Sequence, residues 1–187
     1  MAKEELNDLS GPFNPELTFE DLSKEFLLKI MNVWQFAWVQ LATAFYDEIK
    51  DRFGFDAAND VNLAAWHRMS KKVNPRYAKI ANVQVNTVID ALKVLQLPLD
   101  NTMGQLYRAE HEIINENDVI VTIRNCRSLE YYEKEAPEMI QPICHVLEKE
   151  IMEEYMLNPK AKATPLKLPP RKSKDDISCQ WRFTIED

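Results

Sequence analysis

The chain has 187 residues, of which 45% are hydrophobic. This length and content support one domain with a substantial core and are too small for two domains of ordinary size. The net charge is -7, from 23 basic and 30 acidic residues, and it disfavours general nucleic-acid binding, because phosphate contacts need concentrated Lys and Arg. Three cysteines, an odd number, do not suggest a secreted disulfide framework. With no targeting segment, we expect a protein of the reducing cytoplasm.

The most apolar stretch of the chain is Phe26–Tyr46, which carries a single charged residue, Lys29, and two of the four tryptophans. The polar residues in and around this stretch recur at helical spacing on one narrow stripe: Glu25, Lys29, Asn32, Gln40, Thr43, Asp47 and Asp51. Because everything off the stripe is apolar, we expect a central helix that the rest of the chain covers on most of its circumference. A membrane span is disfavoured, since polar residues interrupt the window and no basic cluster flanks it.

The first 17 residues have no periodic pattern and are expected to form a tail or a surface arm. Thr18 and Asp21 resemble a capping box that starts the long helix near Phe19. Gly54 is placed to end that helix in a left-handed conformation. A helix of this length would extend roughly 50 Å, so we expect a kink or break near its start.

Three shorter helices are expected to follow the long one. Asp56 is placed to cap the first of them. Asn74 and Pro75 are a typical N-cap and first-residue pair, and they predict the start of the second. Asn86 or Thr87 is placed to cap the third.

Beyond Pro98 the period of the hydrophobic pattern changes from helical to two. Leu106–Ile114 and Val119–Cys126 are rich in strand-forming residues and are joined by a turn-forming cluster, so we expect an antiparallel hairpin. The residues expected on one face of its second strand are Val119, Val121 and Ile123. Alternation in Cys179–Ile185 predicts a third strand with one apolar face.

The connection between the second and third predicted strands has two parts. Ser128–Leu157 is acidic and helical in pattern, and Pro137 and Pro142 divide it into pieces. Asn158–Lys174 holds four prolines, six basic residues and no acidic residue, so we expect an extended segment or loop.

The predicted fold class is therefore α+β. It consists of an N-terminal helical bundle around one long apolar helix, packed on a three-stranded antiparallel sheet with a helical insert before the last strand. The expected organisation is a tail, residues 1–17, and a single domain, residues 18–187. That domain would have a helical half, 18–98, and a half with the sheet and helical insert, 99–187.

The cysteines are the first candidates for chemistry. If the third strand lies antiparallel to the second, Cys126 and Cys179 come to the same end of the sheet, and Cys144, beside His145, could join them. Three thiols and a histidine would suit zinc or another thiophilic metal, although no CxxC pair is present. Three interpretations stay open, in decreasing order of preference: buried thiols acting as small hydrophobes, a thiol-lined pocket or nucleophile, and a metal site. No other cofactor is expected.

Four segments carry a resemblance to a known family: NCRSLEYYEKEA, PIC, NPKAKATPLKLPP and SCQWRF. They resemble the C-terminal half of a family of small proteins of unknown function from anaerobic bacteria and archaea. The positions that match its pattern are Cys126, Cys144, Pro169, Pro170, Cys179, Trp181 and Phe183. A more distant similarity is to the aminothiazoline-carboxylate hydrolases. The family's cysteine pair before Pro-Pro is replaced here by Pro165 and Leu168, which lowers the expectation of a metal.

The histidines offer candidate bases. His111 lies between Glu110 and Glu112 in a predicted strand, and His67 follows Trp66 on a predicted helix, where it could reach the polar stripe of the long helix. The preferred interpretation of His111 is a sheet residue that is solvated or hydrogen-bonded, and that of His67 is a partly exposed helix residue. An enzyme would need Cys126 or Cys179 as a thiolate of lowered pKa near a base such as His111 or His145, so enzymatic activity is left open.

The aromatic residues suggest the wall of a small-molecule pocket, although ordinary core packing also accounts for them. The ligand-binding candidates are Trp34, Trp38, Tyr46, Trp66, Arg124, Cys126, Arg127 and Trp181. Arg124 or Arg127 would pair with the carboxylate of an apolar or aromatic acid.

The function that the sequence favours is therefore a small-molecule binding or sensing protein with an aromatic- and cysteine-lined pocket. The alternatives are a cysteine-dependent, hydrolase-like enzyme, and a helical oligomer or protein-interaction module in which the apolar helix covers a second copy. The expected partners are a small-molecule ligand and a second copy of the chain in a homodimer, without nucleic acid or membrane.

Overall fold

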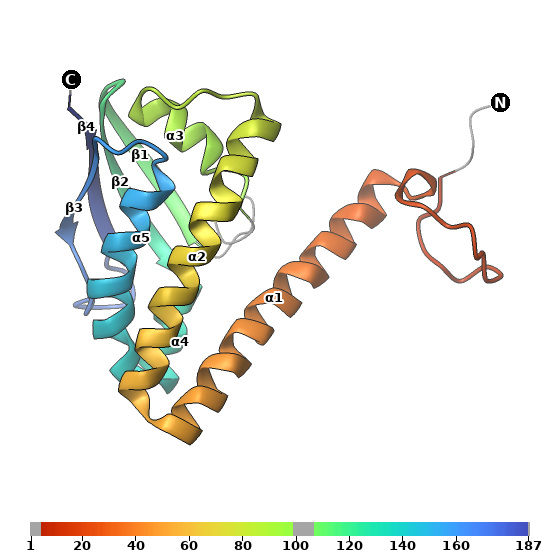
Figure 1. Cartoon of the computed structure of the whole chain (residues 1–187), viewed down its shortest axis with the longest axis horizontal. Helices are drawn as coiled ribbons and strands as arrows, with labels where there is room; N and C mark the ends of the chain where they lie inside the picture. Colours follow the sequence, from red (N-terminus) through yellow and green to blue (C-terminus); the bar gives the residue numbers. More distant parts are fainter. Residues whose placement is uncertain (1–4, 99–106, 187) are drawn as a thin grey trace. The chain divides into compact units, whose positions relative to one another are not determined.

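The computed structural model describes residues 5–98 and 107–186 and divides the chain into two compact units, Met1–Glu48 and Ile49–Asp187. The helices are α1 (Lys24–Phe53), α2 (Phe55–Ala81), α3 (Val88–Val94), α4 (Arg127–Glu135) and α5 (Glu148–Tyr155), and the strands are β1 (Tyr107–Asn115), β2 (Asp118–Cys126), β3 (Ala161–Lys167) and β4 (Cys179–Ile185) (Figure 1). Between α4 and α5 lie a 3-10 turn, Pro137–Met139, and a π-helical segment, Ile140–Leu147. The predicted α+β class is confirmed.

The N-terminal unit contains the predicted capping box, but the box caps a short turn and not the long helix. The backbone N–H of Thr18 donates to Asp21 Oδ2 (2.8 Å) at the start of the 3-10 turn Phe19–Asp21. The chain then becomes extended at Leu22, which forms a short parallel bridge with Leu6 of the N-terminal arm. Leu6 N donates to Asp21 O (2.8 Å), and Ser23 N donates to Leu6 O (2.9 Å). The expected break near the start of the helix lies here, and α1 begins only after it.

Helix α1 ends at Gly54 as predicted, and its φ of 90° favours glycine, but its ψ of 169° differs from the left-handed helical conformation that was expected. Helix α2 then runs unbroken through Pro75, so the prediction that Asn74 and Pro75 begin a separate helix is wrong. A proline inside a helix removes the hydrogen bond to the carbonyl four residues earlier. Here that carbonyl belongs to Lys71, an exposed residue, so water can satisfy it. The third predicted cap is confirmed, because the backbone N–H of Asp90 donates to Thr87 Oγ1 (3.1 Å) at the start of α3.

The sheet has four antiparallel strands in the order β1-β2-β4-β3. The predicted hairpin and the strand at Cys179–Ile185 are confirmed; Leu106, the first residue of the predicted hairpin, lies outside the described residues. The expectation of three strands is wrong, because β3 forms within Asn158–Lys174, which was predicted to be an extended segment or loop. Its alternation places only Ala161 and Ala163 inside, which is a weak apolar signal. Pro165 is tolerated because β3 is an edge strand with one row of unpaired backbone groups.

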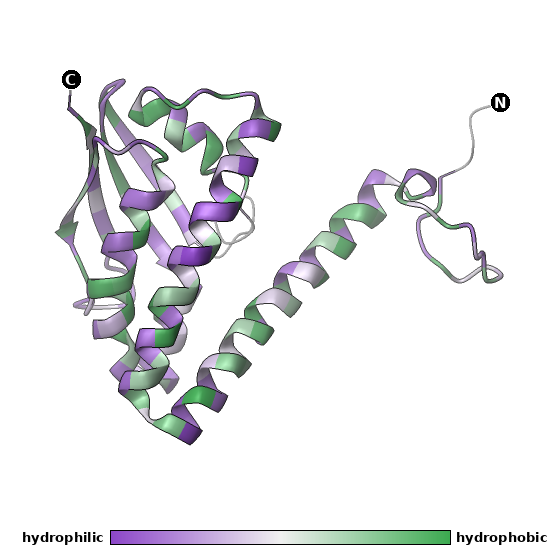
Figure 2. Cartoon of the chain, in the orientation of Figure 1, coloured by the Kyte–Doolittle hydropathy of each residue, from purple (hydrophilic) through white to green (hydrophobic). Residues whose placement is uncertain are grey.

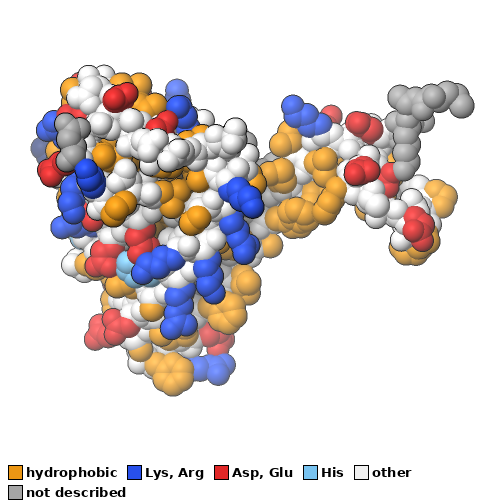
Figure 3. Space-filling model, turned by 45° about the horizontal axis from the view of Figure 1, so that its top comes forward, with side chains coloured by type: hydrophobic (Ala, Val, Ile, Leu, Met, Phe, Trp, Pro, Cys, Tyr) orange, Lys and Arg blue, Asp and Glu red, His pale blue; other side chains and the backbone are white. Residues whose placement is uncertain are grey.

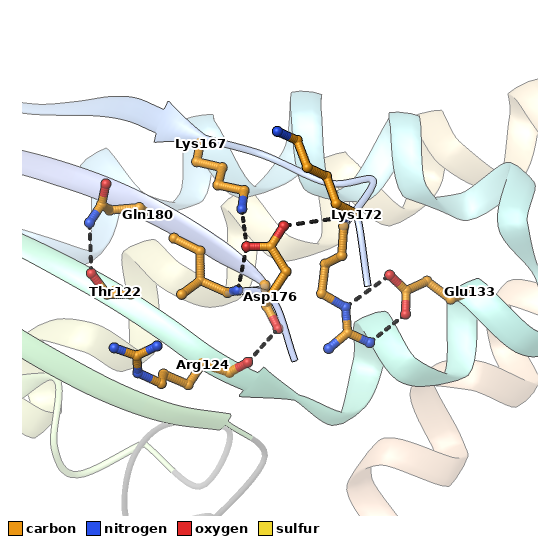
Figure 4. Close-up of polar contacts among 10 residues, drawn as sticks. Thr122, Arg124, Glu133, Lys167, Lys172, Asp176 and Gln180 are labelled. Atoms are coloured by element: carbon orange, nitrogen blue, oxygen red, sulfur yellow. Dashed lines mark hydrogen bonds and ion pairs between the residues drawn. The ribbon is translucent and has the colours of Figure 1, made fainter. Parts of the chain in front are cut away.

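One face of the sheet is covered and the other is polar. Helices α3 and α5 lie over the covered face, and α2 runs beside α5 (Figure 1). The buried residues that form this core are Val88, Ala91, Val119, Val121, Ile123, Met156, Ala161, Ala163, Trp181, Phe183 and Ile185. On the other face, side chains bond across strands, as from Gln180 Nε2 to Thr122 Oγ1 (2.9 Å) (Figure 4). Another such bond runs from Arg182 Nε to Asp118 Oδ1 (2.8 Å).

The core around the sheet contains no residue of α1 among those that the structure describes. The expectation that the apolar helix is the centre of the fold is therefore wrong. The reason is that α3, α5 and the covered face of the sheet bury one another without it. Figure 2 shows apolar residues around most of α1, yet no helix within the described ranges is long and apolar enough to cross a bilayer.

We expect Trp181→Ala to lower the free energy of unfolding by about 3–5 kcal/mol, because this side chain is 2% exposed at the centre of the covered face. Chemical denaturation would measure the loss. The matched control is Leu166→Ala on the edge strand, which should change stability by less than about 0.5 kcal/mol because Leu166 is exposed. Equal losses for the two variants would contradict the position of the core.

Candidate functional site

Helices α2 and α5 meet through polar residues. His67, Ser70 and Asn74 follow one another on α2 at spacings of three and four, which places them on one face. Glu150 and Glu154 share a face of α5 for the same reason. Figure 3 shows lysine and arginine side chains in a row over α2, and a histidine bordered by both acidic and basic side chains. This charged contact distinguishes the α2–α5 layer from the apolar α5–sheet layer.

His67 is held between two carboxylates of α5. Its Nδ1 lies 2.6 Å from Glu154 Oε1, and its Nε2 lies 3.0 Å from Glu150 Oε2. A carboxylate only accepts, so both ring nitrogens donate, and the geometry selects the imidazolium form. The hydrogen bond to Glu154 is the largest cause that raises the pKa of His67, partial burial opposes it, and Glu150 raises it further. His67 thus links the two helices as a cation.

A groove of about 420 Å³ opens beside this ion cluster. Its walls come from α2, from the end of α5 and from the start of β3, and the lining residues are Ser70, Lys71, Pro75, Glu153, Glu154, Leu157, Asn158, Pro159, Ala161 and Lys162. This volume lies in the range of small-molecule sites, roughly 300–1,000 Å³. Carboxylates, ammonium groups and an amide in one groove favour a charged ligand over an apolar one.

Two buried polar atoms of α2 and α5 have no hydrogen-bond partner among the residues that the structure describes. They are Glu154 Oε2, an acceptor, and Asn74 Nδ2, a donor. The other oxygen of Glu154 already bonds to His67, and Lys71 Nζ is 3.9 Å from that oxygen. Asn74 is only 4% exposed, one helical turn beyond Ser70. Buried polar atoms in folded proteins are almost always paired, so these two are exceptions in the α2–α5 layer.

Sequence reasoning missed this cluster. It considered His67 as a partner of the polar stripe on α1, whereas the structure pairs it with α5. The only signal in the sequence was the spacing of four between Glu150 and Glu154, which is common on solvated helix faces. Nothing local indicates that α2 and α5, more than 80 positions apart, lie side by side.

A second and smaller cavity lies under the covered face of the sheet. It has a volume of about 50 Å³ and is lined by Leu92, Leu95, Gln96, Tyr107, Ala109, His111, Val121, Ile123, Met152, Tyr155, Trp181 and Phe183. Two predicted site residues, His111 and Trp181, therefore share one cavity. Partial burial lowers the pKa of His111 and favours its neutral form. The cavity has room for a few water molecules and not for an aromatic ring with its carboxylate.

The other predicted ligand residues are spread over several elements. Trp34, Trp38 and Tyr46 lie on α1 in the unit Met1–Glu48, and Trp66 lies on α2. Arg127 is exposed at the start of α4. Arg124 is also exposed, and its Nε donates to Glu110 Oε1 (2.8 Å) on the polar face of the sheet. The structure therefore does not bring either arginine into the cavity that Trp181 lines.

The cysteines occupy one end of the sheet, as the antiparallel pairing predicted. Cys179 is opposite Ile123, and Cys126 follows three residues later on β2. Cys126 Sγ accepts a hydrogen bond from Leu129 N (3.4 Å) and so caps α4. All three thiols are free, and burial is the main cause that raises their pKa values, to about 12 for Cys179. The thiol of Cys144 is close enough to Cys126 and Cys179 for all three to influence one another electrostatically.

Neither a metal site nor a thiol–histidine pair is formed by these groups. Within residues 5–98 and 107–186, no three His, Cys, Asp or Glu side chains are arranged to hold a metal ion. His145 donates from Nε2 to the carbonyl of Pro169 (2.8 Å), so this nitrogen is engaged with the backbone. The connection from β3 to β4 is held by bonds such as Lys172 N to Asp176 Oδ2 (3.2 Å). Glu133 on α4 pairs with Arg171 of this connection (Figure 4).

We expect His67 and His111 to separate in a pH titration followed by NMR. His67 should titrate above 6.5, because its two carboxylate partners stabilise the cation, and His111 below 6.5, because burial disfavours it. The contribution of His67 to stability is then complete below pH 6.5 and is lost as the pH rises through its folded-state pKa. In His67→Gln, this loss of unfolding free energy with rising pH should disappear. A titration midpoint for His67 at or below 6.5 would contradict the geometry.

We expect native protein to react slowly with iodoacetamide near neutral pH, because burial disfavours the thiolate forms of Cys126, Cys144 and Cys179. Mass spectrometry would count the modified sites. Protein unfolded in urea serves as the control and should be alkylated at all three. Fast, selective alkylation of Cys126 or Cys179 in the native protein would instead identify a reactive nucleophile.

Comparison with known proteins gives one match. No curated protein and no solved structure matches the chain. A family model described as a family of unknown function, DUF6125, matches residues 20–185, which covers the helices and the sheet together. Membership of a family of unknown function is thereby confirmed, while the predicted origin of that family in anaerobic bacteria and archaea, its cysteine pattern and the similarity to aminothiazoline-carboxylate hydrolases stay hypotheses. The chain belongs to the DUF6125 family.

Proposed function

We propose that this protein binds or senses a small molecule, and that its site is the groove between α2, α5 and β3. The ligand class is a small zwitterion that carries a protonated nitrogen and a carboxylate. The observation that carries the proposal is the buried oxygen Glu154 Oε2, which has no donor among the described residues and belongs to a residue that lines a groove of ligand size.

The preference for a protonated nitrogen follows from the charges around Glu154. His67 bonds to one carboxylate oxygen and Glu150 bonds to His67, so this group of three carries one excess negative charge when His67 is protonated. Glu153, another acidic lining residue, adds negative charge. A ligand ammonium would satisfy the free oxygen through a charge-assisted hydrogen bond, which is stronger than a neutral one.

The preference for a carboxylate follows from the basic residues at the rim. Lys71 on α2 and Lys162 on β3 line the groove, and both are exposed. An acidic ligand was expected from the sequence, with Arg124 or Arg127 as its partner. The two lysines are better placed for that role, because they line the same groove as the buried carboxylate.

A cysteine-dependent hydrolase is the alternative that the sequence leaves open. Its thiolate would need a lowered pKa, whereas burial raises the pKa values of Cys126 and Cys179. His145, one of the two candidate bases, also uses one ring nitrogen in its hydrogen bond to the Pro169 carbonyl. The geometry therefore supports binding better than thiol catalysis.

Three probes that share a phenyl ring and differ in charge would test the proposal: phenylalanine, phenethylamine and 3-phenylpropionate. We expect phenylalanine to raise the melting temperature most, phenethylamine less, and 3-phenylpropionate least, because only the first two supply a donor for Glu154. In Glu154→Gln, the shifts caused by the two amines should be lost. In Lys71→Ala, only the advantage of phenylalanine over phenethylamine should shrink.

The matched control is Glu130→Gln, which removes an exposed carboxylate on α4 without altering the groove. Its ligand-induced shifts should equal those of the wild type. If none of the probes shifts the wild-type melting temperature and native mass spectrometry finds no bound compound, the proposal fails. A larger shift with 3-phenylpropionate than with phenylalanine would restore the prediction of an aromatic acid without a protonated nitrogen.

A further inference from the structure

Helix α1 is apolar along most of its length, and some of its apolar residues also follow a heptad pattern. Residues at successive spacings of four and three form one line along the helix, the α1 seam: Leu27, Met31, Trp34, Trp38, Leu41 and Phe45. Such spacing is that of the a and d positions of paired helices. At 1.5 Å per residue, the seam is about 27 Å long.

The α1 seam is substantially exposed. Trp34 is 52% exposed even though Phe19 packs edge-on against it, with ring centroids 5.8 Å apart, and Phe45 is 62% exposed. Met31, Trp38 and Leu41 are also exposed. Figure 3 shows hydrophobic side chains gathered along this helix. The other residues of the unit Met1–Glu48 thus leave most of the seam uncovered.

The apolar area that the unit Met1–Glu48 leaves uncovered is larger than an ordinary surface patch. With aromatic side chains of about 150–250 Å² each, the seam and its apolar flanks expose roughly 700 Å² per chain. The largest apolar patch on a typical monomer is about 300–600 Å². A standard protein–protein interface buries about 800 Å² on each partner. The area of the seam therefore matches one half of a specific interface.

The flanking positions favour pairing with an identical helix. On either side of the seam lie Leu28, Gln35, Ala42, Ile30, Ala37 and Ala44, none of which is charged. Without charges, two identical seams do not repel each other, and the alanines let two backbones approach beside the large tryptophans. The polar stripe with Lys29, Asn32 and Gln40 lies on the opposite side of the helix and can stay solvated.

We infer that the α1 seam is a homotypic interface, through which α1 packs against α1 of a second copy of this chain. The contact is isologous, so each copy presents the same patch and the assembly closes as a dimer. This inference is independent of the proposed ligand groove, whose lining residues all lie in the unit Ile49–Asp187.

Light scattering coupled to size exclusion, with the full-length chain over a wide concentration range, would test the interface. We expect the wild type to be a dimer. Trp38→Glu and Leu41→Glu should each give a monomer, because each places a charge in the seam. Phe36→Glu is the matched control: Phe36 is apolar and 65% exposed on the same helix but lies opposite the seam, so this variant should remain dimeric. Circular dichroism of all variants would check that the helices persist.

A wild type that is monomeric at every concentration would overturn the inference. In that case, shielding of the seam tryptophans from an aqueous quencher would show that the chain covers its own seam, and co-sedimentation with anionic lipid vesicles would indicate a lipid surface instead. A dimer that survives both Trp38→Glu and Leu41→Glu, or that is lost equally in Phe36→Glu, would also rule out the seam as the contact.

Discussion

Helix α5 packs against the apolar face of the sheet on one side and against the polar face of α2 on the other, and the arrangement of the C-terminal unit depends on these two contacts. Met152 on one side of α5, and Met156 directly after the helix, pack on the covered face of the sheet with Trp181 and Phe183. Because side chains three and four positions apart share a helix face, Glu150 and Glu154 then point together toward α2. The apolar contact fixes where α5 lies, and the position of α5 decides which polar groups meet α2.

The consequence for α2 is a polar inner face. Asn74 and Ser70 are almost fully buried, and the hydroxyl of Ser70 bonds to the carbonyl of Trp66 (2.7 Å). Polar contacts of this kind stabilise less than apolar packing, and each unpaired atom has a cost. Among the described residues Glu154 Oε2 and Asn74 Nδ2 have no partner, and the ligand proposed for the groove that Glu154 lines would supply one for the carboxylate oxygen. Stability and binding would then use the same layer of the structure.

The two units also divide the hydrophobic content of the chain differently. The C-terminal unit buries its apolar residues between the sheet, α3 and α5. The N-terminal unit holds the most apolar segment of the sequence and leaves much of it exposed. Hydrophobicity alone therefore did not identify the core, because an apolar helix can serve a core or an interface equally well. The heptad spacing along α1 carries the more specific information.

The local patterns of the sequence determined the elements of this protein. The period-two runs identified β1, β2 and β4, and the alternation of Val119, Val121 and Ile123 identified the covered face. The capping residues Asn86 or Thr87 identified the start of α3, where Thr87 is the cap. Each of these signals depends on neighbours within a few residues, which the sequence displays directly. The sequence did not identify β3 as a strand of the sheet, because its alanines and its proline give almost no local preference for a strand.

Only the tertiary structure decided which elements meet, and therefore the site. His67 and Glu154 are 87 positions apart, and neither position differs in local pattern from a solvated helix residue. Their pairing follows from packing α5 on the sheet and α2 on α5, a sequence of long-range contacts that no local pattern encodes. For the same reason the sequence could name the apolar helix but could not say that the core would form without it. Local preference determines the elements, whereas the burial of apolar surface over the whole chain decides which of their faces meet.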